Sequence, residues 1–320
     1  MIDPRRLKVL RALADHGTVT AAAHALYLSP SAVSQQLAAL ETETGHTLLE
    51  RRGRTVRLTA AGSVLARHAG EISAQLERAE ADLAACSTGL VGEVAVAAFA
   101  TAITEVVAPA VAALRQRAPQ VQVRVKDAEG HTSARLLADG EVDIAIAVEH
   151  RDSLAPGTGR LLHAPLYEEP FDAVLPPGHR LAGAGEVDLK DLAEDPWITP
   201  WPGNPVHEAV LRACEQARFQ PRVECLSDDF SAVCALVAVG AGVALVPRSA
   251  LHGIRPALTP AVRPLRGPGP TRRVLTAVRS GSEGHPLLRL ALAELRERAA
   301  ALTPARPAFE NTGRTPVRGY

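Results

Sequence analysis

The chain has 320 residues, more than one typical domain, and 47% of them are hydrophobic, which is enough for two or more cores. Its 35 basic and 35 acidic residues balance to a net charge of zero, which excludes a protein that coats nucleic acid by bulk charge. No apolar run reaches the length of a membrane span, and the first residues predict a charged amphipathic helix rather than a signal peptide. We therefore expect a cytoplasmic protein that has no membrane partner.

Residues 19–38 predict two short helices joined by a tight turn. Each segment has an apolar stripe at helical spacing, made by Val19, Ala22, Ala23 and Leu26 in the first and by Val33, Leu37 and Leu40 in the second. Ser29 followed by Pro30 is a typical helix start. Two stripes that can pack together indicate a docked pair, which is the outline of a helix-turn-helix.

The outer face of the second helix is polar. It carries Ser31, Ser34 and Gln35, and with Ser29 and Pro30 at the helix start these residues are our predicted DNA contacts in the major groove. A Gln side chain can pair with adenine through two hydrogen bonds. The alternative is a solvated helical hairpin.

Residues 45–59 predict a β-wing, with a short apolar segment, a Gly turn and an alternating strand at 55–58. The arginines around the turn are Arg51, Arg52, Arg54 and Arg57. We expect them to contact the DNA backbone, which positions a protein without specifying sequence; an ordinary charged turn is the alternative. Residues 1–58 have eight basic and five acidic residues, a balance of +3, so affinity would depend on placement and on more than one copy.

Residues 58–86 predict one long helix with a heptad seam. Apolar or small residues alternate at spacings of four and three, at Leu58, Gly62, Leu65, Ala69, Ile72, Leu76, Ala79, Leu83 and Cys86. Such a helix would be roughly 43 Å long, too long to bury its seam against a small winged domain alone. We therefore predict a homodimer formed through Leu65, Ile72, Leu76 and Leu83, with an intramolecular helix on the following domain as the alternative. Two recognition helices in a dimer would read an inverted repeat in double-stranded DNA.

From residue 90 onward, short strands rich in Val and Ile alternate with helices. The predicted strands are Val94–Phe99, Val121–Lys126, Val142–Val148, Phe171–Leu175, Trp197–Thr199, Val223–Leu226, Val243–Val246 and Val274–Val278. The pattern predicts a mainly parallel sheet in two α/β lobes, the first at about 90–164 and 266–303 and the second at about 165–265. This is the architecture of a periplasmic-type binding protein. Residues 304–320 have no apolar period and predict a disordered tail.

Ligands of such folds lie in the cleft, near strand ends and helix N-termini. Thr101 and Ala102 follow the first strand and open a helix, whose free N–H groups would favour a carboxylate or other anionic small-molecule effector. Thr199 lies at a strand end in the second lobe, and Trp201 could close over the ligand. The alternatives are an N-cap role for Thr101 and an ordinary exposed loop position for Trp201.

Metal, redox and catalytic chemistry are not indicated. The four cysteines form no Cys-x-x-Cys pair and have no His at metal spacing, so we expect no metal and no cofactor. A redox switch between Cys225 and Cys234 is disfavoured, because the pattern puts one in a buried strand and the other on the apolar side of a helix. No catalytic motif is present, so we expect no enzyme activity. An enzyme, or a cytosolic small-molecule carrier with a dimerising helical N-terminus, is the alternative to a DNA-binding protein.

Several motifs resemble a known family. Residues 19–38, followed by Leu40-Glu41, Leu48-Leu49-Glu50-Arg51, Arg57-Leu58-Thr59 and Ala61-Gly62, resemble the N-terminal region of LysR-type transcriptional regulators. The resemblance continues more weakly to about residue 300, most plainly at 137–146 and 239–247. The chain departs from the family at Leu49, where Phe is usual, and at Ser29, where Gln is common.

The resemblance implies a specific organisation and function. A winged helix-turn-helix (1–58), a linker helix (59–88) and a two-lobed effector-binding domain (90–303) would form a dimer through the linker, and commonly a tetramer. By similarity, Thr199 would face Thr101 across the cleft. The chain would then be a sequence-specific transcriptional regulator, in which the effector changes how the dimers are arranged on DNA.

Overall fold

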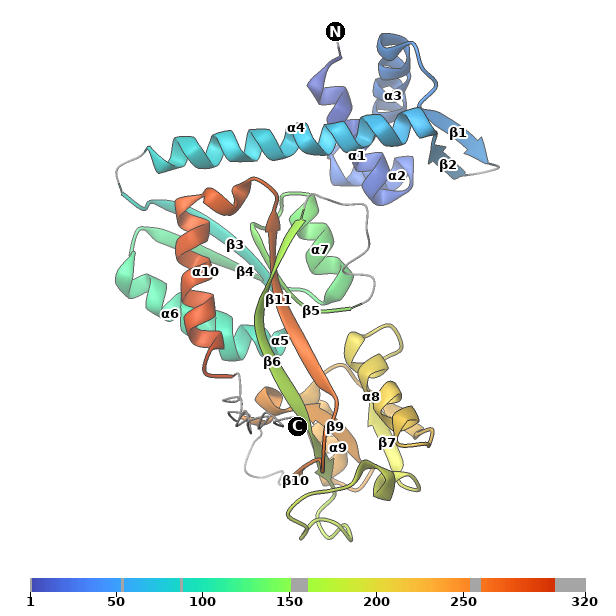
Figure 1. Ribbon diagram of the computed structural model, residues 1–320, viewed down its shortest axis with the longest axis vertical. Helices are drawn as coiled ribbons and strands as arrows, with labels where there is room; N and C mark the ends of the chain where they lie inside the picture. Colours follow the sequence, from blue (N-terminus) through green and yellow to red (C-terminus); the bar gives the residue numbers. More distant parts are fainter. Residues whose placement is uncertain (1, 53–54, 87–88, 151–160, 254–259, 303–320) are drawn as a thin grey trace, which may run out of the picture.

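The computed structural model of the chain describes residues 2–52, 55–86, 89–150, 161–253 and 260–302. Figure 1 shows an elongated molecule with the N-terminal helices at one end, one long helix beneath them, and two α/β lobes below that helix. The predicted tail at 304–320 lies outside the described residues.

The N-terminal domain is a winged helix-turn-helix, as predicted. Its elements are α1 (Pro4–His16), α2 (Val19–Ala25), α3 (Pro30–Thr44), β1 (Leu49–Arg52) and β2 (Thr55–Leu58). Strands β1 and β2 pair antiparallel. The predicted stripes do meet, because Ala22, Val33, Leu37 and Leu40 are buried in one core with Leu10 of α1.

Two motif residues of this domain have clear structural roles. Glu41 Oε1 accepts hydrogen bonds from the backbone N–H groups of Leu48 (2.7 Å) and Leu49 (3.1 Å), which fixes the chain as it enters β1. Gly62 lies so close to β1 that an added Cβ would be 2.1 Å from the Leu48 carbonyl oxygen. Glu41 and Gly62 thus both fix the start of the wing against the helices.

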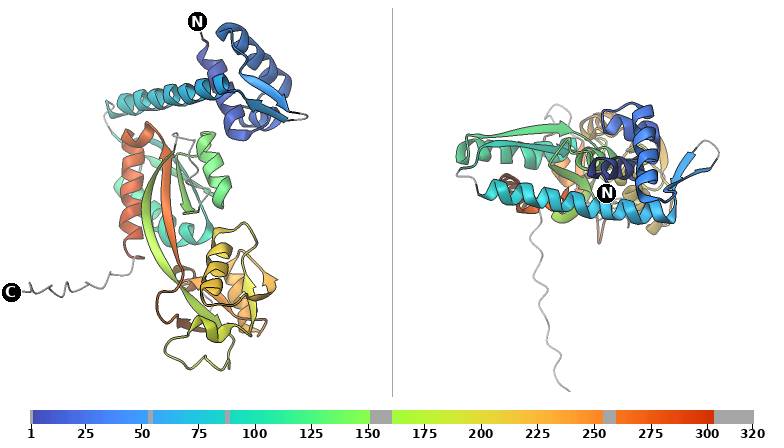
Figure 2. Two further views of the ribbon diagram at one scale, coloured as in Figure 1. Left: turned by 45° about the vertical axis from the view of Figure 1, so that its right-hand side comes forward. Right: turned by 90° about the horizontal axis from the view of Figure 1, so that it is seen from above.

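The linker helix α4 (Ala60–Ala85) contacts both neighbouring domains (Figures 1 and 2). Its first turns join the winged-domain core, and further along, a different face lies against η5 (Ser282–Gly284) of the first lobe. A Cβ on Gly281 would be 2.1 Å from the Ala74 carbonyl oxygen, so glycine is needed for this approach. The helix therefore lies on the following domain, as the intramolecular alternative proposed, but not through its heptad seam.

Polar contacts strengthen this arrangement. Arg279 Nε donates to Glu77 of α4 at 2.7 Å, and its Nη2 donates to Asp143 at 3.1 Å. Asp143 Oδ2 also accepts a hydrogen bond from the backbone N–H of Ala95 at 2.9 Å, so this residue has a structural role. His16 Nε2, at the end of α1, lies 2.8 Å from Asp139 Oδ1, which joins the winged domain directly to the first lobe.

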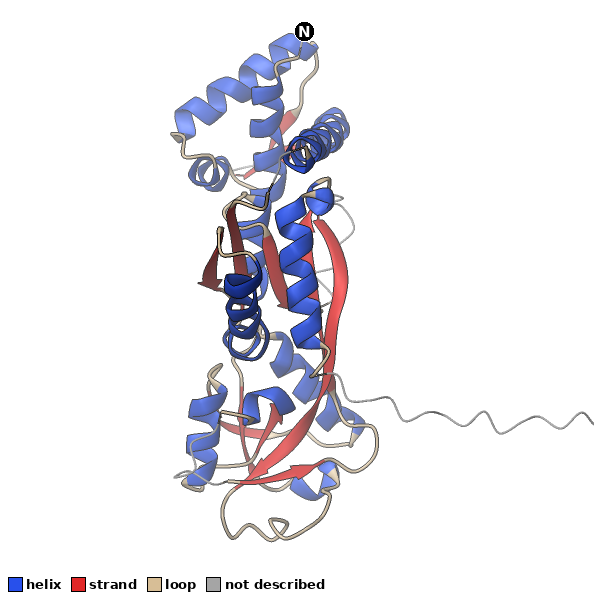
Figure 3. Cartoon of the chain, turned by 90° about the vertical axis from the view of Figure 1, so that its left-hand side faces the viewer, coloured by secondary structure: helices blue, strands red, loops and turns tan. Residues whose placement is uncertain are grey.

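Lobe 1 is a sheet covered by helices on both faces (Figure 3). Its elements are β3 (Gly92–Ala98), α5 (Ala100–Ala102), the π-helix η1 (Ile103–Val107), α6 (Ala108–Arg117), β4 (Val121–Asp127), α7 (Gly130–Ala138), β5 (Ile144–Val148) and α10 (Pro286–Ala299). Val94 and Val96 pack with α6 and α10 on one face, while Ala97 packs with Leu137 of α7 on the other. This alternation is what a period-two strand requires.

Two long antiparallel strands, β6 (Leu161–Leu175) and β11 (Thr271–Arg279), connect the lobes. The predicted strand Phe171–Leu175 is only the second half of β6, whose first part pairs with β11 in lobe 1. The prediction of a mainly parallel sheet is wrong. Strands β3, β4 and β5 are parallel, but β11 pairs antiparallel with both β5 and β6. The chain passes between lobes along strands rather than through crossover helices, and that requires antiparallel neighbours.

Lobe 2 completes the sheet and adds its own helices. Its elements are η3 (Leu189–Leu192), β7 (Pro196–Thr199), α8 (Pro205–Gln216), β8 (Arg222–Leu226), α9 (Phe230–Ala238), β9 (Ala244–Pro247), η4 (Arg248–Leu251) and β10 (Ala261–Pro264). Strands β9 and β10 flank the second half of β6, and β10 was not predicted. Trp197 is fully buried in the core beneath α8.

Candidate DNA-binding surface and effector cleft

The predicted DNA-reading residues lie together on the exposed face of α3. Ser29 Oγ caps the helix by accepting from the backbone N–H of Ala32 at 3.2 Å. Ser31, Ser34 and Gln35 are exposed, as are Ser29 and Pro30. Ser34 Oγ donates to the Pro30 carbonyl oxygen at 3.0 Å, and no side-chain hydrogen bond is found for Gln35 within the described ranges. The Gln35 amide is therefore available to a partner.

Tyr27, in the turn between α2 and α3, was missed by the sequence reasoning. Its side chain is 84% exposed and its φ is +54°, a left-handed conformation that is costly for a residue with a Cβ. An exposed aromatic ring held in a strained turn beside the recognition helix is a further candidate for contact with DNA. The only sequence signal was an aromatic residue where turns usually have Gly or Asn.

The predicted wing arginines are only partly described. Arg51 and Arg52 belong to β1, where Arg51 pairs with Val56 and Arg52 with Thr55. The structure describes the backbone of these two arginines but not their side chains. Arg54 lies outside the described residues. The exposed Arg57 of β2 pairs in register with Glu50.

The predicted dimerisation seam divides into two parts. Leu65 packs against the winged-domain core, so its side chain is already partly buried within the monomer. Ile72, Leu76 and Leu83 are 41%, 59% and 71% exposed. Leucine and isoleucine side chains this exposed, on one stripe of a helix, form an apolar face without a partner in the monomer.

The two lobes meet at a buried ion pair between Arg272 of β11 and Glu169 of β6. The side chains of both residues are 2% exposed, and Arg272 Nε donates to Glu169 Oε1 at 2.7 Å. Ser249 of lobe 2 donates to the same carboxylate through its N–H (2.7 Å) and its hydroxyl (3.0 Å). Arg272 also lies over the rings of Phe99 and Phe230, at 5.0 and 6.0 Å from their centroids. Residues from both lobes therefore converge on one guanidinium.

Thr101 belongs to this cluster. Its Oγ1 accepts a hydrogen bond from Arg272 Nη2 at 2.9 Å. Ala102 is fully buried in the lobe 1 core, so only its backbone could face a ligand. Phe99, not Thr101, occupies the N-cap position of α5, and the helix continues as the π-helix η1.

Other titratable side chains lie near the Arg272 cluster. The positive charge of Arg272 is already matched by Glu169. Burial raises the pKa of the Glu129 carboxyl above its ordinary value, and the nearby Asp228 carboxylate adds to the shift. Burial also raises the pKa of Tyr167, whose hydroxyl has no hydrogen-bond partner among the described residues. The sequence did not predict Glu129, Tyr167 or Asp228 as neighbours of this cluster, because the fold brings them together from distant segments.

In lobe 2, Thr199 is buried and its hydroxyl is 3.3 Å from His207 Nδ1. No hydrogen bond joins Thr199 to Thr101 in the part of the chain that is described. Trp201 is exposed, and its backbone N–H donates to Asp228 at 3.1 Å. The motif at residues 239–247 has a structural role in this lobe. A Cβ on Gly242 would be 2.6 Å from the Pro196 carbonyl oxygen.

The cysteines are unpaired. Cys86 is exposed, Cys225 is intermediate, and Cys214 and Cys234 are buried. Burial raises the pKa of the Cys214 thiol to about 12 and that of Cys234 to about 11, so neither is a ready thiolate. Among the described residues no cluster of His, Cys, Asp and Glu side chains could hold a metal ion, and no helix is long and apolar enough to cross a membrane.

A winged helix-turn-helix joined by a long helix to a two-lobed α/β domain defines a DNA-binding regulator with a sensing domain. Two family models match the chain: "Bacterial regulatory helix-turn-helix protein, lysR family" over residues 4–63 and "LysR substrate binding domain" over residues 87–300. The chain therefore belongs to the LysR family of DNA-binding transcriptional regulators that carry an effector-binding domain.

Known relatives agree with this assignment. The nitrogen assimilation regulatory protein nac of Klebsiella aerogenes is 30% identical over 251 residues, covering 78% of this chain and 80% of nac. The transcriptional regulator AlsR of Bacillus subtilis is 29% identical over 258 residues, or 78% of this chain and 82% of AlsR. A full-length OxyR variant from Pseudomonas aeruginosa has the same fold, with a TM-score of 0.66 and 24% identity over 96% of this chain and 99% of that one. CbnR in complex with its target DNA has a TM-score of 0.55 and 24% identity over 93% of this chain and all of CbnR.

The junction between the lobes can be tested by removing one charge. Glu169→Gln leaves Arg272 buried without a counter-charge and should lower the free energy of unfolding by about 3–5 kcal/mol. Asp172→Asn is the matched control, because Asp172 lies on the same strand but its partner Arg248 is 45% exposed and can be hydrated. The control should lose only about 1 kcal/mol. Equal losses in urea unfolding would contradict a special role for the buried pair.

Proposed function

We propose that α3 reads DNA through Ser29, Pro30, Ser31, Ser34 and Gln35, while Arg51, Arg52 and Arg54 of the wing contact the phosphate backbone. The observation that carries this proposal is the exposed polar face of a helix whose other face is buried and whose start is capped by Ser29. A rigid helix of this kind positions short side chains at base edges. Acting on promoter DNA, the protein would work in the cytoplasm and would need no catalytic activity.

We infer that the unpartnered stripe of Ile72, Leu76 and Leu83 is covered by a second copy of the chain. Charged side chains flank the stripe, among them Glu71, Arg78 and Glu80, as in a helix that pairs through a narrow seam. A two-fold pair of α4 helices would present two α3 helices to an inverted repeat. Two such dimers would make the tetramer that the family resemblance implies.

We propose that a small effector binds between the lobes, near Thr101, Ala102, Thr199 and Trp201. Binding there would alter the contacts of Arg272, the residue on which both lobes converge. Lobe 1 in turn holds α4 through Arg279 and the winged domain through Asp139. A change between the lobes can thus reach the arrangement of the dimers on DNA.

Gln35 provides a test of DNA reading with a control next to it. Gln35→Ala should weaken binding to the protein's own upstream intergenic DNA about tenfold or more, while binding to a scrambled duplex changes little, since a bidentate base contact is worth about 1–3 kcal/mol. Gln36→Ala is the control, because Gln36 Oε1 accepts a hydrogen bond from Arg6 Nε at 3.3 Å within the domain. This variant should retain specific binding. Gel shifts over a salt series measure both, and an unchanged preference in Gln35→Ala would contradict the proposed role.

An Arg51/Arg52→Ala variant should lose affinity for both duplexes and show a shallower salt dependence.

Dimerisation can be tested on the exposed seam. Leu76→Glu should convert the dimer to a monomer at micromolar concentration, because the charge would be buried in the seam. The fold of the monomer should be little affected, since Leu76 is 59% exposed there. Gln75→Glu adds the same charge one residue away and should remain dimeric. Sedimentation analysis distinguishes these results, and a dimeric Leu76→Glu protein would place the interface elsewhere.

Effector coupling can be tested at Thr101. Once screening has found a metabolite that alters the footprint of the wild-type protein on DNA, Thr101→Val should abolish that change while leaving DNA binding intact. Thr104→Val is the control, because Thr104 Oγ1 only donates to the Ala100 carbonyl oxygen within its own helix. A normal response in Thr101→Val would exclude Thr101 from the effector site.

A further inference from the structure

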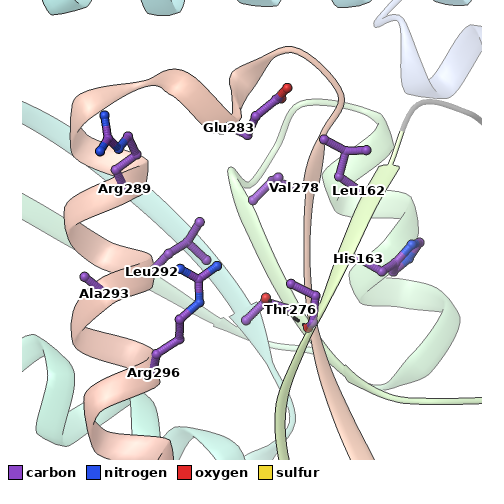
Figure 4. Close-up of a pocket in the computed structure, with 10 residues that line it drawn as sticks. Leu162, His163, Thr276, Val278, Glu283, Arg289, Leu292, Ala293 and Arg296 are labelled. Carbon is purple, nitrogen blue, oxygen red and sulfur yellow. Dashed lines mark hydrogen bonds between the residues drawn. The ribbon is translucent and has the colours of Figure 1, made fainter.

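A pocket opens on the outer side of lobe 1, between α10 and the paired strands β6 and β11 (Figure 4). Its volume is about 430 Å³, which lies within the range of small-molecule sites. Four residues of extended strand separate Thr276 in this pocket from Arg272 at the lobe junction, a span of roughly 13 Å, and the pocket lining includes no residue of the Arg272 cluster. The pocket is therefore distinct from the proposed effector cleft.

The floor and one wall of the pocket are apolar. Val278 of β11 pairs in register with Leu162 of β6, and Thr276 pairs with Ala164, so these four residues share one face of the strand pair. Leu292 of α10 lies opposite them (Figure 4). Leu162 is a large hydrophobic side chain left exposed. Together these side chains offer an apolar surface that water covers poorly.

The rim of the pocket is positively charged. Arg296 extends from α10 across the pocket toward Thr276, and Arg289 lies two helical turns away at the upper edge (Figure 4). Neither guanidinium has an ion pair or side-chain hydrogen bond within the described ranges. By contrast, Arg298 on the same helix pairs with Glu297 at 3.0 Å.

The other two titratable residues that line the pocket are Glu283 and His163. The Glu283 carboxylate at the rim accepts a hydrogen bond from the backbone N–H of Gly281 at 2.6 Å, which holds it in its own turn. The His163 ring points away from the other lining side chains (Figure 4), and burial lowers its pKa, which disfavours its charged form. Arg296 is thus the polar group best placed to meet a ligand.

We propose that this pocket is a second ligand site, one that binds a small carboxylate with an apolar body. The planar guanidinium of Arg296 would hold the carboxylate through two hydrogen bonds, with Arg289 adding positive charge. The apolar body would cover Leu162, Val278 and Leu292. The site adjoins η5, whose neighbour Gly281 packs on α4, so a bound ligand would lie beside the joint between the linker helix and lobe 1.

Calorimetric titration of the full chain with 3-phenylpropanoate tests this proposal. We expect saturable binding with one ligand per chain, binding at least tenfold weaker for the neutral 3-phenylpropanamide, and weaker binding again for acetate, which lacks the apolar body. Arg296→Gln should weaken 3-phenylpropanoate binding at least tenfold, since it removes the charged hydrogen bonds. Arg115→Gln removes another exposed helical arginine, one on α6, and should have no effect.

Three outcomes would overturn the proposal. Equal binding by the wild type and Arg296→Gln would exclude this pocket, as would an absence of saturable binding. Loss of binding in Thr101→Val but not in Arg296→Gln would assign the ligand to the cleft between the lobes. Thermal unfolding of each variant shows whether it is folded, and because Arg296 is exposed its substitution should leave the melting temperature unchanged.

Discussion

The ion pair between Arg272 and Glu169 is the interaction on which the effector domain depends. It is buried where β6 and β11 pass from one lobe to the other, and it is completed by Ser249 from lobe 2 and Thr101 from lobe 1. A buried pair adds little net stability compared with apolar packing, but removing one partner is costly. The pair instead fixes how the two lobes meet. Its hydrogen bonds form together only when β6, β11, Ser249 and Thr101 are in one particular arrangement.

The linker helix has two different contact faces. One face lies on lobe 1, where Gly281 permits close contact and Arg279 pairs with Glu77. The other is the exposed stripe that includes Leu76. Because the two faces point in different directions, contact with lobe 1 and pairing with a second chain are compatible. In the dimer proposed above, the helix would carry a change in lobe 1 to its partner helix without leaving either surface.

Local patterns in the sequence predicted much of the fold. The two helices around Ser29, the wing and the long helix all follow from apolar periodicity and capping, which act over a few residues. The antiparallel joining of the lobes was missed, because β6 reads as a short strand only over its buried half. The cluster around Arg272 could not be predicted either, since Glu169, Thr101 and Ser249 are brought together by long-range pairing that no local signal records.

The path of the chain through the lobes sets the order in which the protein can fold as it is synthesised. The winged domain and α4 are complete by residue 85, but lobe 1 needs β11 and α10, which follow all of lobe 2. Until residue 279 has left the ribosome, β5 has β3 on one side and an open edge on the other. Open edges invite incorrect pairing, so the nascent chain is exposed to that risk throughout this stage. The DNA-reading part of the molecule thus forms well before the part that controls it.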